Sequence, residues 1–64
     1  MFDTHKFTEH SIVKFFYSKD GERKEYEGTI VHIFGSGFYM IEFECDGETL
    51  CECIDLNINF VYPN

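Results

Sequence analysis

The sequence predicts a small all-β domain, a five-stranded barrel preceded by a short N-terminal arm. Short runs of β-branched and aromatic residues recur along the chain, turn residues separate them, and no window holds a sustained helical period. The chain has 64 residues, of which 44% are hydrophobic and 19% aromatic. This composition is too apolar for a disordered chain, and the length suits one domain with a thin core.

The strand and turn signals follow each other in a regular order. Strands are expected at residues 11–17, 28–34, 38–44, 48–54 and 58–62. The segments between them are expected to be a long charged loop at 18–27, turns at 35–37 and 45–47, and one helical turn at 55–57. Residues 1–10 are polar with scattered Phe and are interpreted as an arm, so that 11–64 form the barrel.

Five strands, a long first loop and a helical turn before the last strand describe an SH3-like barrel. The segment EGTIVHIFGSGFYMIEFECDGETLCECIDL resembles small bacterial SH3-like barrel domains of unknown function. The matching residues are Gly28, Thr29, Ile30, Val31, Tyr39, Ile41, Phe43, Asp46, Gly47 and Thr49. The resemblance runs from Ile12 to Val61, and the Cys51-Glu52-Cys53 segment and the Phe-bearing arm depart from it. It implies the fold and no particular activity.

Strand alternation predicts which side chains face the core. Two three-residue hairpin loops, Gly35–Gly37 and Cys45–Gly47, make the strand patterns agree on one apolar face, with Glu44 opposite Glu48. A two-residue Asp-Gly turn would instead direct Glu48 and Glu52 inward, where a carboxylate is costly to bury. The expected core is Val13, Phe15, Tyr17, Thr29, Val31, Ile33, Tyr39, Ile41, Phe43, Thr49, Cys51 and Cys53.

The opposite face is expected to carry two zones. The apolar zone contains Ile30, His32, Phe34, Phe38, Met40 and Leu50, and the acidic zone contains Glu42, Glu44, Glu48 and Glu52. An exposed apolar patch bordered by charge often marks an interface. The predicted partner-binding residues are therefore Phe34, Phe38, Met40, Glu42, Glu44, Glu48, Leu50 and Glu52.

Three alternatives remain open for this face. The arm can fold across it and bury Phe2 and Phe7 against Phe34, Phe38 and Met40, or sheet twist can draw part of it into the barrel. A second copy of the chain can cover it, which makes a homodimer. A foreign protein can bind it.

Charge narrows the class of partner. Residues 1–24 hold all five basic residues and four acidic ones, whereas residues 25–64 hold eight acidic residues and no Lys or Arg, for a net charge of −7. Such a field repels phosphate, so nucleic acid is not an expected partner, and a basic protein is. No segment has the length of a membrane span or the pattern of a signal peptide. An odd count of three cysteines favours free thiols in a cytoplasmic protein.

No residue pattern indicates an enzyme, a metal site or a cofactor site. Cys51-x-Cys53 lacks the spacing of zinc-binding pairs and falls on core positions, while Cys45 falls in a turn. The histidines His5, His10 and His32 do not have the spacing of a helical metal site. Gly35-Ser36-Gly37 is too short for a phosphate loop.

The sequence thus favours a non-enzymatic, acidic protein-binding module. Its partner is expected to be a basic protein, such as a toxin, a nuclease or a phage-defence component, which the module binds or inhibits. A self-associating module is the second hypothesis. The third is a Tudor-like reader of methylated Lys or Arg, with Tyr17, Tyr26, Phe38 and Tyr62 as candidate cage rings.

Overall fold

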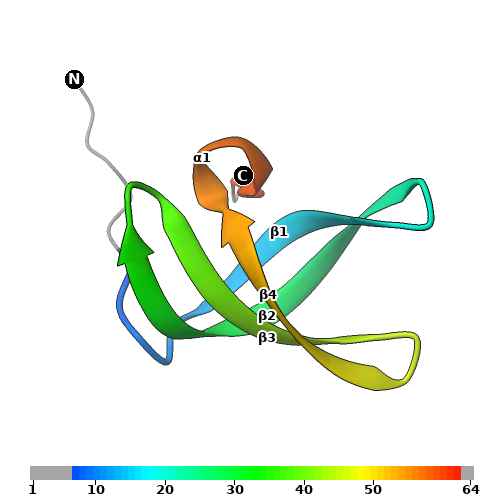
Figure 1. Ribbon diagram of the computed structural model, residues 1–64, viewed down its shortest axis with the longest axis horizontal. Coiled ribbons are helices and arrows are strands. Elements are labelled where there is room, and N and C mark those ends of the chain that lie inside the picture. Colours follow the sequence, from blue (N-terminus) through cyan, green and yellow to red (C-terminus); the bar gives the residue numbers. More distant parts are fainter. Residues whose placement is uncertain (1–6, 63–64) are drawn as a thin grey trace.

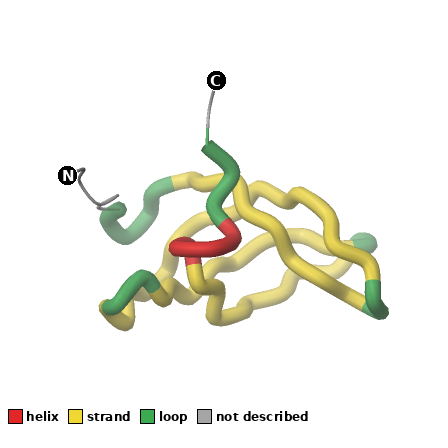
Figure 2. Tube along the Cα trace, turned by 90° about the horizontal axis from the view of Figure 1, so that it is seen from above, coloured by secondary structure: helices red, strands yellow, loops and turns green. Residues whose placement is uncertain are grey.

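A computed structural model describes residues 7–62 as one antiparallel sheet and one short helix. The elements are β1 (Ile12–Lys19), β2 (Glu22–Gly35), β3 (Phe38–Cys45), β4 (Glu48–Asp55) and α1 (Leu56–Asn59), and the strands lie in the order β1-β2-β3-β4. Figure 1 shows the β1–β2 and β3–β4 turns at one end of the molecule and the β2–β3 turn at the other. Figure 2 shows α1 on one side of the curled sheet. The all-β prediction is confirmed in this form, as an open sheet of four strands.

All three hairpins have two-residue turns. In Asp20-Gly21, Ser36-Gly37 and Asp46-Gly47 both residues have positive φ, which is the type I′ geometry that matches strand twist. The long loop expected at 18–27 is therefore wrong, because β1 and β2 extend to the Asp20-Gly21 turn. The dipeptide Asp-Gly is a strong hairpin signal, and here charged side chains flank it.

The two-residue turn after β3 changes the register of β4. Cys45 pairs with Glu48, Glu44 with Thr49 and Phe43 with Leu50, so the expected Glu44–Glu48 pair is wrong. A shift of one residue turns every side chain of a strand to the other face. As a result Thr49, Cys51 and Cys53, which were expected in the core, are exposed, and Glu48, Leu50, Glu52 and Ile54 lie on the core-bearing face.

Two irregularities in β2 also alter the expected core. The register with β3 shifts between Ile30 and His32 and again between Ile33 and Gly35. The extra residues at these bulges re-aim their neighbours. Ile30 is consequently fully buried, whereas Val31 and Ile33, both expected in the core, remain 39% and 38% exposed.

The core lies on one face of the sheet, called the inner face below; the opposite face is the outer face. The core consists of Val13, Phe15, Ile30, Tyr39, Ile41, Phe43, Cys45, Ile54 and Leu56. Phe15 and Phe43 meet edge to face, with ring centroids 4.9 Å apart. Tyr17 and Tyr26 pack against this centre and are half-buried, as is Thr29 on the outer face. Val13, Phe15, Tyr39, Ile41 and Phe43 are confirmed as core residues.

Gly28 lies where β2 pairs with both neighbouring strands, opposite Val13 of β1 and Phe43 of β3. A Cβ atom here would lie 2.7 Å from the carbonyl oxygen of Glu42 and 2.7 Å from a methyl group of Ile41. Only glycine fits this contact without displacing the strands. The close approach lets one long strand serve both hairpins.

The C-terminal segment forms a helix where part of a strand was expected. The Asp55 carboxylate caps α1 by accepting a 2.9 Å hydrogen bond from the Asn57 amide. The helical turn was expected at 55–57, and α1 instead occupies Leu56–Asn59, so the strand expected at 58–62 is reduced to a single bridge between Phe60 and Phe15. The Val61 amide also donates to the Lys14 carbonyl, over 3.0 Å.

The arm was considered as a cover for Phe34, Phe38 and Met40. Its residues 1–6, including Phe2, lie outside the described part of the chain. Phe7 packs instead against Tyr39 and Phe60, with ring centroids 5.7 and 5.2 Å away. The Phe7 ring is therefore an extension of the core.

Candidate partner-binding surface

The structure divides the eight predicted partner-binding residues between two faces. On β3, buried and outward residues alternate, which places Phe38, Met40, Glu42 and Glu44 on the outer face. On β4, Glu48, Leu50 and Glu52 lie on the inner face, and Phe34 stands at the β2 bulge near the β2–β3 turn. The expectation that all eight share one face is therefore wrong, because it depended on the three-residue loop.

The glutamates nevertheless remain close in the sheet. Glu42 and Glu44 lie one strand away from the β4 edge on the outer face, and Glu48 and Glu52 lie on β4 itself on the inner face. Three of them are exposed and Glu52 is half-buried. We call these four the β3–β4 carboxylates. Each faces a neutral cross-strand neighbour, so direct repulsion across the β3–β4 ladder is avoided.

Within residues 7–62 these carboxylates take part in none of the ion pairs. The pairs that the described residues form are Lys19–Asp46, at 3.4 Å, and Lys24–Glu22, at 3.5 Å. Both pairs are exposed to solvent, where an ion pair adds little stability. The negative charge of the β3–β4 carboxylates is thus available to a partner. On the outer face of β2, exposed Glu25 and Glu27 add to it.

Two contacts connect the hairpins that carry this charge. The hydrogen bond from Lys19 to Asp46 joins the β1–β2 hairpin to the β3–β4 turn and raises the pKa of the Lys19 ammonium. Tyr17 lies near Glu52, and desolvation, followed by the Glu52 charge, raises the pKa of the tyrosine hydroxyl. These contacts therefore connect the two hairpins at the end of the sheet where the β1–β2 and β3–β4 turns lie, close to the carboxylates.

A buried thiol contact lies below the same end of the sheet. The thiol of Cys45 donates to the Tyr26 hydroxyl over 3.3 Å. The interaction with the Cys45 sulfur favours the neutral phenol, whose O–H can donate to that sulfur, and together with desolvation it raises the pKa of Tyr26 to about 12. Cys45 was expected in a turn; it is instead the last residue of β3 and is only 1% exposed.

The Tyr26 shift predicts a loss of stability in alkali. An unfolded tyrosine titrates near pH 10, so between about pH 10 and pH 12 the unfolded chain releases this proton and the folded chain keeps it. The free energy of unfolding should therefore fall as pH rises through this range. Urea denaturation of wild type and Tyr26→Phe across the range measures the slope, with Tyr62→Phe as control. The slope should be shallower only in Tyr26→Phe, and equal slopes in all three proteins would contradict the assignment.

The three cysteines should differ in accessibility. Cys51 and Cys53 are exposed on the outer face and Cys45 is buried, the reverse of the expected arrangement. Because access limits thiol chemistry, Ellman's reagent should modify two thiols of the folded protein quickly and the third only after unfolding. A Cys51→Ser/Cys53→Ser variant should lose the fast phase. Rapid modification of that variant in its folded state would show that the β4 register is different.

An exposed apolar group lies at the β2–β3 end of the sheet. Phe34 is 52% exposed and Phe38 41%, and β2 also exposes Val31 and, on the inner face opposite Tyr39, Ile33. The ring of His32 contacts Phe34, with centroids 4.7 Å apart. Ile30 and Leu50, expected in this zone, lie in the core and on the inner face, respectively. The two bulges produce this grouping, and strand alternation alone does not reveal it.

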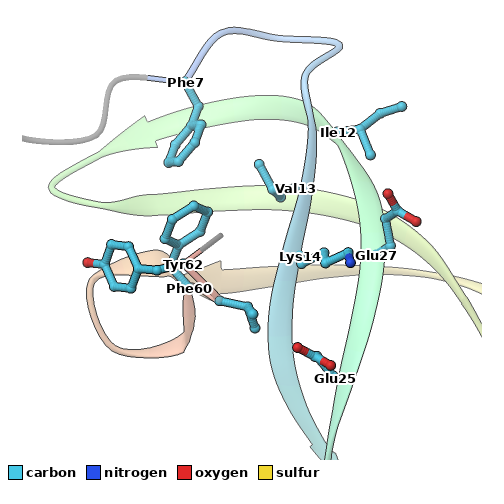
Figure 3. Close-up of a pocket in the computed structure, with 9 residues that line it drawn as sticks. Phe7, Ile12, Val13, Lys14, Glu25, Glu27, Phe60 and Tyr62 are labelled. Carbon is cyan, nitrogen blue, oxygen red and sulfur yellow. The ribbon is translucent and has the colours of Figure 1, made fainter. Parts of the chain in front are cut away.

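A groove of about 530 Å³ runs along β1 and was not expected from the sequence. Its lining residues are Phe7, Ile12, Val13, Lys14, Glu25, Glu27, Phe60, Val61 and Tyr62. Figure 3 shows the Phe7, Phe60 and Tyr62 rings on one side of β1 and the Glu25 and Glu27 carboxylates on the other. Rings and carboxylates thus do not enclose one cation. In the sequence, the aromatic residues near both chain ends were the signal that could have indicated this groove.

The rings considered for a methyl-lysine cage lie in different places. Tyr17 and Tyr26 pack together on the inner face, with centroids 6.0 Å apart, and both contact Phe43. Phe38 lies on the outer face, and Tyr62 packs against Phe60. A cage requires several rings around one cation, and these four do not provide it.

For metal ions and membranes, the described residues give two further findings. In the range 7–62 no group of three or more His, Cys, Asp or Glu side chains is placed to hold a metal ion. The thiols cannot gather, since Cys45 points inward and Cys51 and Cys53 point outward. No helix in this range is long and apolar enough to cross a membrane.

Comparison with protein-family models, with curated proteins and with solved structures finds no match to this chain. The functional interpretation therefore depends on the geometry and charge of the β3–β4 carboxylates and of the surfaces next to them.

Proposed function

We propose that this protein is a non-enzymatic, cytoplasmic binding module that docks a basic partner protein through the β3–β4 carboxylates. The supporting observation is their charge, since none of the four forms an ion pair with a cation among residues 7–62. A toxin, a nuclease or a phage-defence component has the basic surface that such a module would bind or inhibit. Charge complementarity raises the association rate and excludes acidic competitors.

The exposed apolar side chains at the β2–β3 end would form the apolar centre of the interface, and this centre would be desolvated when the partner binds. Phe38 and Met40 lie on the outer face of β3, and the exposed Phe34 ring contacts His32, which pairs with Met40. Aromatic anchors dominate the energy of many interfaces, while charges around them set orientation and rate. The proposed interface thus combines Phe34, Phe38 and Met40 with the carboxylates of β3 and β4.

The same apolar group supports a second candidate, a homodimer through Phe34, Phe38 and Met40. A Phe38→Asp substitution would then convert a dimer to a less stable monomer. Sedimentation equilibrium of the wild-type chain distinguishes the candidates, because a monomer with unchanged stability in Phe38→Asp excludes the homodimer. The chain's net charge of −7 opposes self-association.

We also propose that the architecture is an SH3-like barrel. The strand order, the one-turn α1 and the contacts of Phe60 and Val61 with β1 support this reading. In such a barrel the Val61 amide would exchange slowly with solvent, as strand amides do. Fast exchange at Val61 would favour an open four-stranded sheet.

A pull-down from cell lysate, with bound proteins identified by mass spectrometry, tests the proposed function. The wild-type chain is compared with a Glu42→Gln/Glu44→Gln/Glu48→Gln/Glu52→Gln variant of the same length and shape. A basic protein captured by the wild type and lost by the variant supports the proposal. Equal capture by both chains would mean that these carboxylates only solvate the surface.

A further inference from the structure

β4 is an edge strand with an open side. Within residues 7–62 it pairs with β3 alone, and this pairing is unbroken from Phe38–Asp55 to Cys45–Glu48. Edge strands are usually protected by Lys, Pro, a bulge or an inward-facing charge. Of these devices β4 has only its inward-facing glutamates, chiefly the half-buried Glu52. Such a charge disfavours another acidic strand and favours a basic one.

The turn geometry identifies the backbone groups of β4 that do not bond to β3. In a two-residue hairpin the residues flanking the turn, here Cys45 and Glu48, form a hydrogen-bonded pair, and bonding alternates from there. Glu48, Leu50 and Glu52 therefore direct their N–H and C=O groups toward β3. Those of Thr49, Cys51 and Cys53 point away from the sheet, and the side chains of these three residues are also exposed.

Charge selects the occupant of this edge. β4 carries Glu48, Glu52 and Asp55 and no cation, and Glu42 and Glu44 lie on the neighbouring strand. A second copy of β4 would bring these acidic side chains together, and like charges on paired strands are destabilising. An extended segment with Lys or Arg at alternate positions meets the opposite charge, and main-chain hydrogen bonds supply affinity in strand addition.

We propose that β4 binds an extended basic segment of the partner protein as an added strand, through the backbone groups of Thr49, Cys51 and Cys53. This inference rests on the proposed function and specifies the form of its partner. On the inner face the segment places basic residues opposite Glu48 and Glu52 and an apolar residue opposite Leu50. On the outer face, long side chains cross the small residues of β4 toward Glu42 and Glu44, about 10 Å away at two strand spacings.

A designed peptide tests the strand addition and the inner-face part of this arrangement. The sequence Val-Thr-Arg-Thr-Val-Thr-Arg, with blocked ends, sets Arg opposite Glu52 and Glu48 and Val opposite Leu50 in an antiparallel register. We expect binding to slow the amide exchange of Thr49, Cys51 and Cys53 at least about tenfold, with little change at Leu50 and Glu52. As a further control, the exchange of the same amides is measured without peptide at several protein concentrations, which detects pairing of β4 with a second copy of the chain.

Two N-methylated peptides provide the matched control. Methylation of the central Thr amide removes a donor that faces Cys51 and should weaken binding at least about tenfold. Methylation of the central Val amide alters a group that faces solvent and should leave the affinity nearly unchanged. We expect the Thr-methylated peptide to give no protection of the Thr49, Cys51 and Cys53 amides, and the Val-methylated peptide to protect them as the unmodified peptide does.

Other outcomes overturn the inference, and one of them leaves the proposed function intact. Salt-dependent peptide binding that protects none of the three amides, or that both methylations weaken equally, means that the carboxylates attract basic chains without strand addition. Protection that rises with protein concentration alone means that a second copy occupies the edge. An absence of peptide binding at low salt excludes the basic strand, whereas failure of the proposed function itself would appear as equal capture in the pull-down.

Discussion

Phe15→Ala is expected to leave most of the protein unfolded at 37 °C. The ring is fully buried in the middle of β1 and contacts Phe43 at 4.9 Å and Tyr26 at 6.4 Å between centroids. Removing such a ring costs about 3–5 kcal/mol. A domain of this size has a total stability of about 3–10 kcal/mol. Urea or thermal denaturation followed by circular dichroism measures the loss.

The neighbouring Phe16 provides the matched control. It lies on the outer face of the same strand, is half-buried, and its ring carries the Arg23 guanidinium 4.1 Å from the centroid. An exposed cation–π contact contributes about 0.5–1 kcal/mol, so Phe16→Ala should lose well under half of what Phe15→Ala loses. Equal losses would mean that the two faces of β1 have been assigned wrongly.

Removal of the β3–β4 carboxylates is expected to have the largest effect on binding. The four Glu→Gln substitutions should slow association with the basic partner by about 10-fold to 1,000-fold at low ionic strength, because steering depends on the summed field. Stopped-flow or surface plasmon resonance gives the rate constants. The dissociation rate should change less, since rim charges act chiefly on association.

Pairwise variants separate the two faces. Glu42→Gln/Glu44→Gln removes outer-face charge and Glu48→Gln/Glu52→Gln removes charge from β4, and each should account for part of the decrease. A Glu9→Gln/Asp20→Asn variant removes the same amount of charge before β1 and in the turn after it. It should retain nearly the wild-type rate. A control as slow as either pair would show that only net charge matters.

The all-β class and five of the nine core residues follow from strand alternation, and the hairpin geometry does not. A three-residue loop at Cys45–Gly47 is favoured if every inner-face position is buried. Glu48 contradicts that premise, because it lies on the inner face of the edge strand β4 and is exposed, although Cys45 opposite it on β3 is buried. The β1–β2 hairpin was likewise not predicted, because charged residues flank Asp20-Gly21 and no alternation of apolar residues surrounds the turn.

The residues of the candidate surface were proposed from the sequence, and the expectation that they share one face was wrong. The glutamates of β3 and β4 were identified from their charge alone, but their division between two faces follows from the Asp46-Gly47 turn. The bulges that expose Val31 and Phe34 depend on how β2 curves past Gly28, a close contact with residues distant in sequence. Such long-range contacts have no local sequence signature.

The dependence of partner affinity on salt tests the central claim most directly. Charges that lie on the surface are screened beyond about 10 Å at 0.1 M ionic strength, and over shorter distances as salt increases. Isothermal titration calorimetry of the wild-type chain with its captured partner, in a series of NaCl concentrations, measures this dependence. We predict that affinity falls steadily as salt rises and that the four-Gln variant shows a much weaker trend. An affinity that stays constant from low to high salt would contradict docking through the β3–β4 carboxylates.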